Sequence, residues 1–253
     1  MTPISKFAAI ALLAVPTACG GASEGEVAAP DAPIEVVEAP EGGEWSDRVA
    51  MTEAGGYLMG NPNAPVSLIE YGSLTCGACA RFELTGLEPL VEQYVNTGRV
   101  SYEFRNYVRD PVDMTAALIA RCGTESQYFG FQKALFETQQ EWVGKGYEYL
   151  QSTPGIAQME SSELFATLAD ITGLKTFASQ RGIAPAKIDA CLAEPGAADK
   201  LLAMNEVGNS DYNVAGTPTM VVNGTTLPVA NSQWEGVGGS QGLSGVLATA
   251  VGE

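Results

Sequence analysis

Val66–Cys79 reads VSLIEYGSLTCGAC, an apolar run that ends in two cysteines separated by two small residues. The run Val66–Tyr71 is rich in β-branched and aromatic residues and has apolar side chains on both faces, which predicts a central, buried strand. Apolar residues at helical spacing follow Cys79, so the cysteine pair is expected at a strand-to-helix junction. A helix N-terminus stabilises a thiolate, the reactive form of cysteine, through its free N–H groups and its dipole. The stretch therefore predicts a redox pair in which Cys76 is the nucleophile and Cys79 its resolving partner.

The composition of the chain excludes several other chemistries. Its 253 residues contain no histidine, so neither a Ser-His-Asp or Cys-His mechanism nor a His-ligated metal site can form. The formal net charge of −17 at pH 7 argues against nucleic acid and anionic membrane surfaces as partners. Hydrophobic residues make up 45% of the chain, enough to bury one sizeable domain with an insertion.

The N-terminal residues predict export. Residues 1–18 combine Lys6, an apolar run and small residues ending at Ala18, a pattern typical of a signal peptide. Cys19 follows at once, and its surroundings resemble a bacterial lipoprotein processing site, which predicts lipidation of Cys19; the alternative is an ordinary cut after Ala18. Residues 19–45 are rich in Ala, Gly, Pro and Glu and are predicted to form a flexible tether. We therefore expect a periplasmic protein held at a membrane by an N-terminal lipid, in a compartment where disulfides persist.

Residues 46–253 are predicted to form the folded domain. Arg99–Arg105 alternates polar and apolar residues and predicts a strand parallel to the first one. Helical patterns then occupy about 110–212, beginning with Asp110 as a cap and a proline at the first helical position. Beyond them, an Asn-Gly pair between apolar runs is a strong hairpin signal. The elements expected there are strands over Thr217–Val222 and Thr225–Val229 and a helix over Ser240–Val251.

This order of elements resembles the thioredoxin superfamily, and specifically its DsbA-like branch. The resemblance is carried by the Cys-x-x-Cys between a strand and a helix, and by Gly216–Thr219, a Gly-Thr-Pro-Thr sequence that opens the hairpin. Two further short stretches also resemble that branch: Gly60–Pro62 before the first strand, and Val222–Gly224 after the Thr-Pro sequence. The resemblance extends from about residue 55 to the end. It implies an α/β thioredoxin fold with an inserted helical domain, and a protein thiol:disulfide oxidoreductase that needs no cofactor.

The resemblance also implies roles for individual residues. Cys76 would be the exposed attacking thiol and Cys79 its buried partner. Pro218 would be a cis proline facing them, and the backbone of Thr217 would pair with the substrate chain. Glu70, six residues before Cys76, falls where the superfamily keeps a buried acid that relays a proton to or from the second cysteine. The alternative for Glu70 is an acid on an edge strand that leans toward the surface.

Two features bear on the direction of electron flow. Gly77 and Ala78 replace the Pro and His common in strong oxidases, and a weaker preference for thiolate lowers the reduction potential toward the isomerase or reductase end. DsbC-type isomerases, however, add an N-terminal dimerisation domain, which residues 19–45 cannot supply. We therefore predict a monomer that favours net dithiol oxidation of client proteins and is recycled by a membrane redox partner. The alternatives are a disulfide isomerase or reductase on the same fold, and a protein that binds Cu(I) or zinc through its thiols.

Two further cysteines, Cys122 and Cys191, fall in helices of the insertion. Some DsbA-like proteins of α-proteobacteria carry a second disulfide in the helical domain, so the resemblance implies a structural disulfide between them. Closing a loop of about 70 residues would contribute roughly 4 kcal/mol in the chain-entropy treatment. The alternatives are two unrelated buried thiols, or a four-cysteine zinc site with Cys76 and Cys79, which would lack a second short Cys-x-x-Cys spacing.

Overall fold

The protein is described here by a computed structural model that covers residues 25–236 and 238–253. Its centre is a six-stranded mixed sheet in the order β1-β2-β4-β3-β5-β6. β3 and β4 are parallel, and the other neighbouring strands are antiparallel. The strands are β1 (Val49–Met51), β2 (Tyr57–Gly60), β3 (Val66–Gly72), β4 (Val100–Asn106), β5 (Thr219–Val222) and β6 (Thr225–Thr226).

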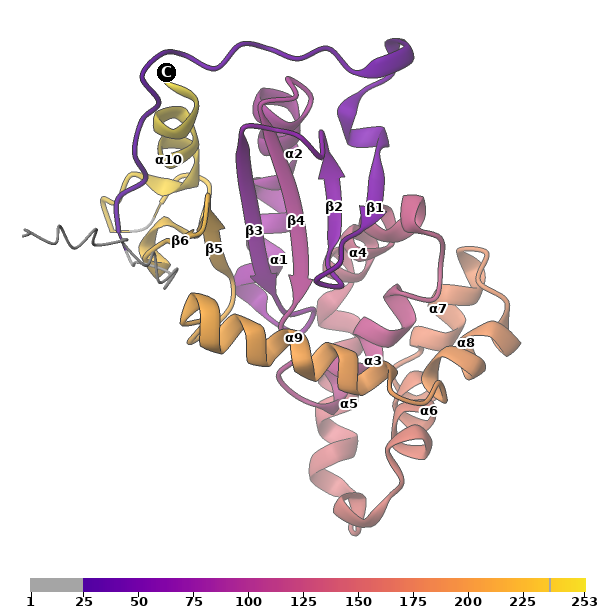
Figure 1. Cartoon of the computed structure of the whole chain (residues 1–253). Coiled ribbons are helices and arrows are strands. Elements are labelled where there is room, and N and C mark those ends of the chain that lie inside the picture. The colour runs from indigo at the N-terminus through magenta and orange to yellow at the C-terminus, as the bar shows by residue number, and fades with distance from the viewer. Residues whose placement is uncertain (1–24, 237) are drawn as a thin grey trace, which may run out of the picture.

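Helices surround this sheet (Figure 1). α1 and α2 lie on one face, α9 crosses the other, and α10 lies at the edge formed by β5 and β6. The helices from α3 to α9 lie between β4 and β5 in the chain, which confirms the predicted thioredoxin fold with a helical insertion. The helices are α1 (Gly77–Thr85), α2 (Leu87–Leu90), α3 (Pro111–Ala120), α4 (Tyr128–Glu137), α5 (Gln139–Ser152), α6 (Ser161–Ile171), α7 (Leu174–Gln180), α8 (Pro185–Leu192), α9 (Ala197–Tyr212) and α10 (Gly242–Val251).

β3 is the strand that positions the cysteine pair. It lies between β4 and β5, where Glu70 is in register with Phe104 on one side and Met220 on the other. The predicted central strand and its parallel partner are thus confirmed. Gly72 ends β3 in close contact with β4, since a Cβ added there would lie 2.3 Å from the Phe104 ring. From this point the chain turns through a short loop, Ser73–Thr75, directly into α1.

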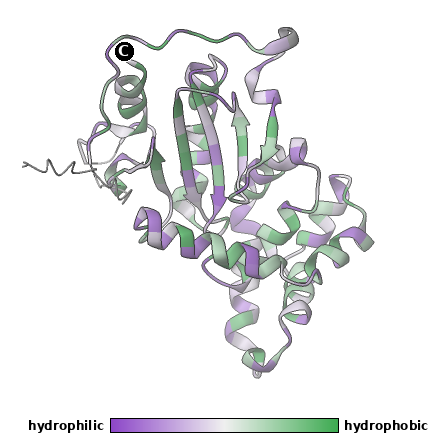
Figure 2. Ribbon diagram, viewed as in Figure 1, coloured by the Kyte–Doolittle hydropathy of each residue, from purple (hydrophilic) through white to green (hydrophobic). Residues whose placement is uncertain are grey.

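The insertion and the sheet share one hydrophobic core. Hydrophobic segments recur in the strands and in the helices of the insertion (Figure 2), and the buried apolar side chains form a single continuous cluster. The insertion is therefore packed directly against the sheet. The largest fully buried side chains include Tyr71, Phe82, Tyr102 and Phe104 from the sheet and α1, and Tyr128, Leu135, Leu168 and Leu174 from the insertion.

Residues 25–45, which we call the N-terminal strap, lie along the domain and cross above the sheet toward β1 (Figure 1). Val27 and Trp45 are buried, and the Ile34 N–H donates to the carbonyl oxygen of Val251 in α10 at 2.9 Å. The sequence predicts a flexible tether here, because the composition is that of a linker. The structure differs because a few apolar side chains, widely spaced, find contacts on the domain.

The predicted C-terminal elements form with shorter bounds. Asn223 and Gly224, at φ 48° and 80°, make the turn between β5 and β6. β6 contains only two residues: the Leu227 N–H still donates to the Met220 carbonyl oxygen at 2.8 Å, and the chain then enters a 3-10 turn over Val229–Asn231. α10 begins at Gly242 rather than at Ser240. Within the part of the chain that the structure describes, no helix is long and apolar enough to cross a membrane.

Candidate active site

Cys76 forms the N-cap of α1, with φ −87° and ψ 121°. Its N–H donates to the Ser73 carbonyl oxygen at 3.1 Å, and its own carbonyl oxygen accepts from the Ala80 N–H at 3.0 Å. Cys79 follows in the first turn of α1, and its Sγ accepts from the Ser73 N–H at 3.5 Å. The two thiols therefore lie one helical turn apart at the N-terminus of α1, as the sequence predicts.

The loop before β5 covers this pair. The Thr217–Pro218 peptide bond is cis and Pro218 is buried. In its protonated form the Cys76 thiol donates to the Thr217 carbonyl oxygen at 3.2 Å, which brings together residues that are 141 positions apart. Cys76 is 6% exposed and Cys79 0%. The resemblance implied an exposed attacking thiol, and this is corrected: Cys76 is nearly enclosed in this reduced state, because Thr217 lies against its sulfur.

The two thiols differ strongly in acidity. The hydrogen bond from the Cys79 thiol, together with the Thr217 side chain and the N–H groups of Cys79 and Ala78, lowers the pKa of Cys76 to about 5, although burial opposes the change. Burial, followed by the hydrogen bond to Cys76 and the charge of Glu70, raises the pKa of Cys79 well above its ordinary value. At neutral pH Cys76 is thus a thiolate and Cys79 a thiol. This thiolate is more stable than the dipeptide between the cysteines predicts, because Cys79 and Thr217 stabilise it.

Glu70 lies on the central strand β3 and is 1% exposed, so the alternative of a surface-leaning acid on an edge strand is excluded. Its Oε2 accepts from the Tyr102 hydroxyl at 2.6 Å. Burial raises the pKa of Glu70 to about 8, opposed by the Tyr102 hydrogen bond and reinforced by the charges of Glu83 and Cys76. Glu70 can therefore hold or release a proton close to neutral pH. Its part in proton transfer with Cys79 stays a prediction.

Sequence analysis missed the side chains of the insertion that hold the loop before Cys76. Asp113, in the first turn of α3, accepts from the Ser73 hydroxyl at 2.6 Å and the Leu74 N–H at 2.8 Å. Gln139, at the start of α5, donates to the carbonyl oxygens of Leu74 and Cys76 at 2.8 and 3.1 Å. These partners are separated by 39 to 65 positions, so no local motif connects them. The only signal in the sequence is an acid at a helix start, which capping alone explains.

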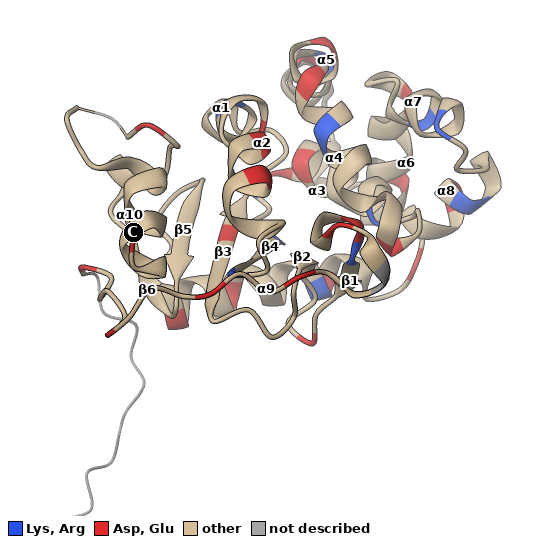
Figure 3. Ribbon diagram, turned by 90° about the horizontal axis from the view of Figure 1, so that it is seen from above, with Lys and Arg blue, Asp and Glu red and all other residues tan. Residues whose placement is uncertain are grey.

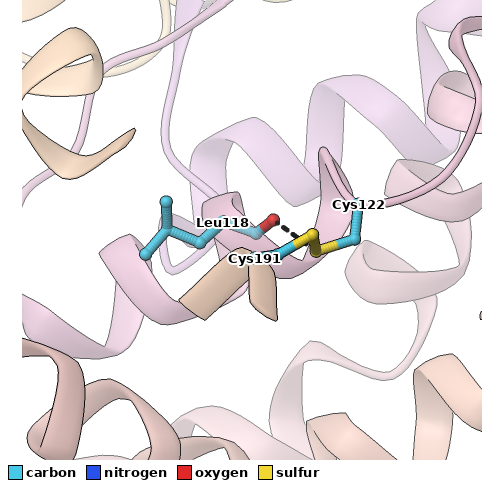
Figure 4. The surroundings of a disulfide bond; sticks show 3 residues. All are labelled: Leu118, Cys122 and Cys191. Carbon is cyan, nitrogen blue, oxygen red and sulfur yellow. Dashed lines mark hydrogen bonds between the residues drawn. A yellow bond between two sulfur atoms is a disulfide. The ribbon is translucent and has the colours of Figure 1, made fainter. Parts of the chain in front are cut away.

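The structure joins Cys122 and Cys191 by a disulfide, with a Cα–Cα distance of 6.0 Å (Figure 4). Cys122 follows α3 and is buried, whereas Cys191 lies on α8 and is half-buried. The Cys122 Sγ lies 3.3 Å from the carbonyl oxygen of Leu118. Being bonded to each other, these cysteines cannot ligate zinc together with Cys76 and Cys79. Among the residues described, no group of three or more His, Cys, Asp or Glu is arranged to hold a metal ion.

Comparison with known proteins decides the family. A family model described as thioredoxin matches residues 52–238. The solved protein-disulfide isomerase of Novosphingobium aromaticivorans is 30% identical, with 78% of this chain and 97% of that chain covered and a TM-score of 0.68. This chain belongs to the thioredoxin family. Alpha-DsbA1 of Wolbachia pipientis has the same fold, with 24% identity, coverage of 70% and 79%, and a TM-score of 0.54.

Curated relatives support the same placement. A Rickettsia typhi protein whose name describes a protein-disulfide oxidoreductase is 26% identical over 168 residues, which are 66% of this chain and 54% of the relative. The chain thus spans about half the length of the curated relatives it matches. Its match to the family includes both the Cys-x-x-Cys pair and the cis proline loop, since Cys76, Cys79 and Pro218 all lie within the matched residues.

Proposed function

We propose that this DsbA-like protein exchanges disulfides with client proteins outside the cytoplasm and that net dithiol oxidation is favoured. The observation that carries the proposal is the opposite acidity of the two thiols, a pKa of about 5 for Cys76 and a strongly raised pKa for Cys79. A stabilised thiolate favours the dithiol form of the protein, which makes its disulfide form a stronger oxidant.

In the proposed reaction the oxidised protein holds a Cys76–Cys79 disulfide. A client thiolate attacks the Cys76 sulfur, a mixed disulfide forms, and Cys79 leaves as a thiolate that takes up a proton, for which Glu70 is the proposed donor. A second client thiolate then attacks the client sulfur of the mixed disulfide and releases Cys76 as a thiolate. The client keeps a disulfide and the protein gains two electrons. The Thr217 backbone, which lies against Cys76, is the proposed pairing site for the client strand.

The proposed setting is the periplasmic side of a membrane. A membrane redox partner would take the two electrons from Cys76 and Cys79 and restore their disulfide, and the protein would act as a monomer. Cys19, the proposed lipidation site, and the proposed signal peptide before it lie outside the described residues. A Cys19→Ser variant should move from the membrane fraction to the soluble periplasm with its redox activity intact. Wild-type protein that is already soluble and carries no lipid mass would overturn the anchor.

The equilibrium reduction potential against glutathione tests the proposed direction of electron flow. A low thiolate pKa predicts a potential less negative than about −180 mV, toward the oxidising end of the superfamily. A potential near about −270 mV, typical of thioredoxin itself, would instead indicate a reductase.

Disulfide isomerisation is the second candidate, because the Novosphingobium aromaticivorans structure is described as a protein-disulfide isomerase. Refolding of a client with scrambled disulfides, without added oxidant, separates the two activities, since an oxidase in its dithiol form leaves the wrong pairings largely in place. Binding of Cu(I) or zinc is tested by the metal content of protein purified under reducing conditions. If the purified protein contained one metal ion per chain and this ion blocked disulfide exchange, the result would contradict the proposed function.

A further inference from the structure

Ser73 contacts both cysteines of the active site, Cys76 through its backbone N–H and Cys79 through its sulfur. Its carbonyl oxygen accepts from the Cys76 N–H at 3.1 Å, and its N–H donates to the Cys79 Sγ at 3.5 Å. Ser73 is itself 1% exposed, and its hydroxyl donates to Asp113 Oδ2 at 2.6 Å. Any shift of Ser73 would therefore change the placement of both sulfurs relative to the N-terminus of α1.

Asp113 binds this loop through both carboxylate oxygens. Oδ1 accepts from the Leu74 N–H at 2.8 Å, and Oδ2 accepts from the Arg109 N–H at 3.1 Å as well as from Ser73. All of these partners donate, so the arrangement suits an acceptor-only carboxylate. Asp113 is 1% exposed, and no basic side chain forms a hydrogen bond or ion pair with it in the described chain.

Two other residues of the insertion hold the same loop. Asp110 Oδ2 accepts from the Tyr147 hydroxyl at 2.8 Å and from the Thr75 hydroxyl at 3.4 Å. Gln139 binds the carbonyl oxygens of Leu74 and Cys76. The loop is thus bound on its N–H, carbonyl and hydroxyl groups by side chains that all come from the insertion.

A buried carboxylate is costly to keep in a fold. Burial raises the pKa of Asp113 to about 7, while the hydrogen bonds from Ser73, Arg109 and Leu74 oppose the rise and the charge of Asp110 adds to it. An apolar side chain of similar size would fill the same space without this cost. The geometry therefore indicates that the carboxylate is retained for its contacts with the loop.

We propose that Asp113 is a positioning residue for the reactive thiol: through Ser73 and Leu74 it fixes the loop that places Cys76 over the N–H groups at the start of α1. The proposal rests on the proposed function and deepens it, because it gives the helical insertion a part in setting the acidity of the nucleophile. The link is physical: hydrogen bonds to a thiolate weaken steeply as their distance and angle depart from the favoured geometry.

The test uses Asp113→Asn in the full chain. Asn keeps the size of the side chain and an acceptor for Leu74, but its amide donors would face the N–H of Arg109 and the Ser73 hydroxyl. Asp199→Asn is the matched control, since Asp199 also lies in the first turn of an insertion helix and is exposed. The readouts are the absorbance of the Cys76 thiolate against pH in the reduced protein, the equilibrium with glutathione, and circular dichroism to establish folding.

We expect Asp113→Asn to raise the midpoint of the Cys76 titration by about half a pH unit or more, which shifts the glutathione equilibrium toward the protein disulfide about threefold. Asp199→Asn should leave both unchanged. A folded Asp113→Asn protein with the wild-type midpoint would overturn the proposal, even if its thermal stability fell. If Asp113→Asn does not fold, the same titration is carried out on Ser73→Ala. We expect the midpoint of the Cys76 titration to rise in that variant, and an unchanged midpoint would overturn the proposal. The titration needs no client protein. Failure of this proposal can therefore be told apart from failure of the proposed function, which would show as a wild-type protein that does not exchange disulfides.

Discussion

Glu70 carries a carboxyl group inside a central strand, where burial raises its pKa from 4.5 to about 8. Between these two pH values the folded protein binds more protons at this site than the unfolded chain, so the site lowers stability as the pH rises. We expect Glu70→Gln to raise the free energy of unfolding at pH 7 by about 3 kcal/mol, since Gln still accepts from Tyr102 and cannot ionise. Urea denaturation at several pH values measures this.

The gain from Glu70→Gln should shrink toward zero at pH 4 and grow up to about pH 8, where the folded-state carboxyl begins to ionise. Tyr102→Phe serves as the control, because it removes the hydrogen bond to Glu70 but leaves the ionisable group. A gain of equal size at pH 4 and pH 8 would show that the titration of Glu70 is not its cause.

The roles of single residues could be predicted from the sequence where a short local motif identifies them. The cysteine pair, Pro218 and the burial of Glu70 follow from short motifs and strand patterns, and the structure brings them together. The enclosure of Cys76 could not be predicted, because it depends on Thr217, which lies 141 positions further along the chain. The contacts of Asp113 with the Cys76 loop were missed for the same reason. The low pKa of Cys76 was underestimated, although its largest cause is the hydrogen bond from Cys79 within the pair itself.

The disulfide between α3 and α8 and the Cys76–Cys79 pair should differ in their resistance to reduction. A Cys76–Cys79 disulfide closes a very short ring and releases a stabilised Cys76 thiolate on reduction, whereas Cys122 is 2% exposed within the helices of the insertion. Mild dithiothreitol should therefore reduce the Cys76–Cys79 pair first. Alkylation and mass spectrometry under graded reduction provide the measurement, and simultaneous labelling of all four cysteines in the folded protein would contradict the expectation.

Helices and strands were predicted best where a repeating hydrophobic pattern coincides with a strong sequence signal for the start or end of the element. The strand predicted over Arg99–Arg105 is β4, at Val100–Asn106, and the helix predicted from the Asp110 cap is α3. The strand after the Asn-Gly turn was predicted too long, since the apolar pattern continues to Val229 although the chain enters a 3-10 turn there after the Leu227–Met220 hydrogen bond. Hydrophobic pattern alone does not show where hydrogen-bond partners end.

At the scale of the whole molecule, Asp and Glu side chains are spread over the sheet and the helices alike (Figure 3), in keeping with the net charge of −17. The N-terminal strap is the part of this architecture that the sequence did not predict. Its composition is that of a linker, yet Val27 and Trp45 are buried against the domain. Composition averages over a segment, whereas two or three anchoring side chains are enough to hold it.

Trp45→Ala should therefore destabilise the whole domain. Trp45 is 6% exposed, and its Nε1 donates to the Val37 carbonyl oxygen at 2.6 Å. Loss of a buried Trp costs about 3–5 kcal/mol in well-packed sites, and we expect about 3 kcal/mol here, measured by urea denaturation. Val36→Ala, at a strap residue that is 55% exposed, is the control and should change little. Equal, negligible effects of both substitutions would mean that the strap behaves as a tether.

The central claim is that Cys76 attacks and Cys79 resolves within one thiol pair whose acidities differ. Trapping of mixed disulfides in cell extracts, read on non-reducing gels, tests it most directly. We predict that Cys79→Ser accumulates mixed disulfides with client proteins. Its Cys76 thiolate still attacks client disulfides, which is the reverse of the oxidising exchange, and Cys79 is no longer present to attack the resulting mixed disulfide and release the client. Cys76→Ser should accumulate almost none. Equal trapping by both variants, or trapping by neither, would contradict this assignment of the two thiols.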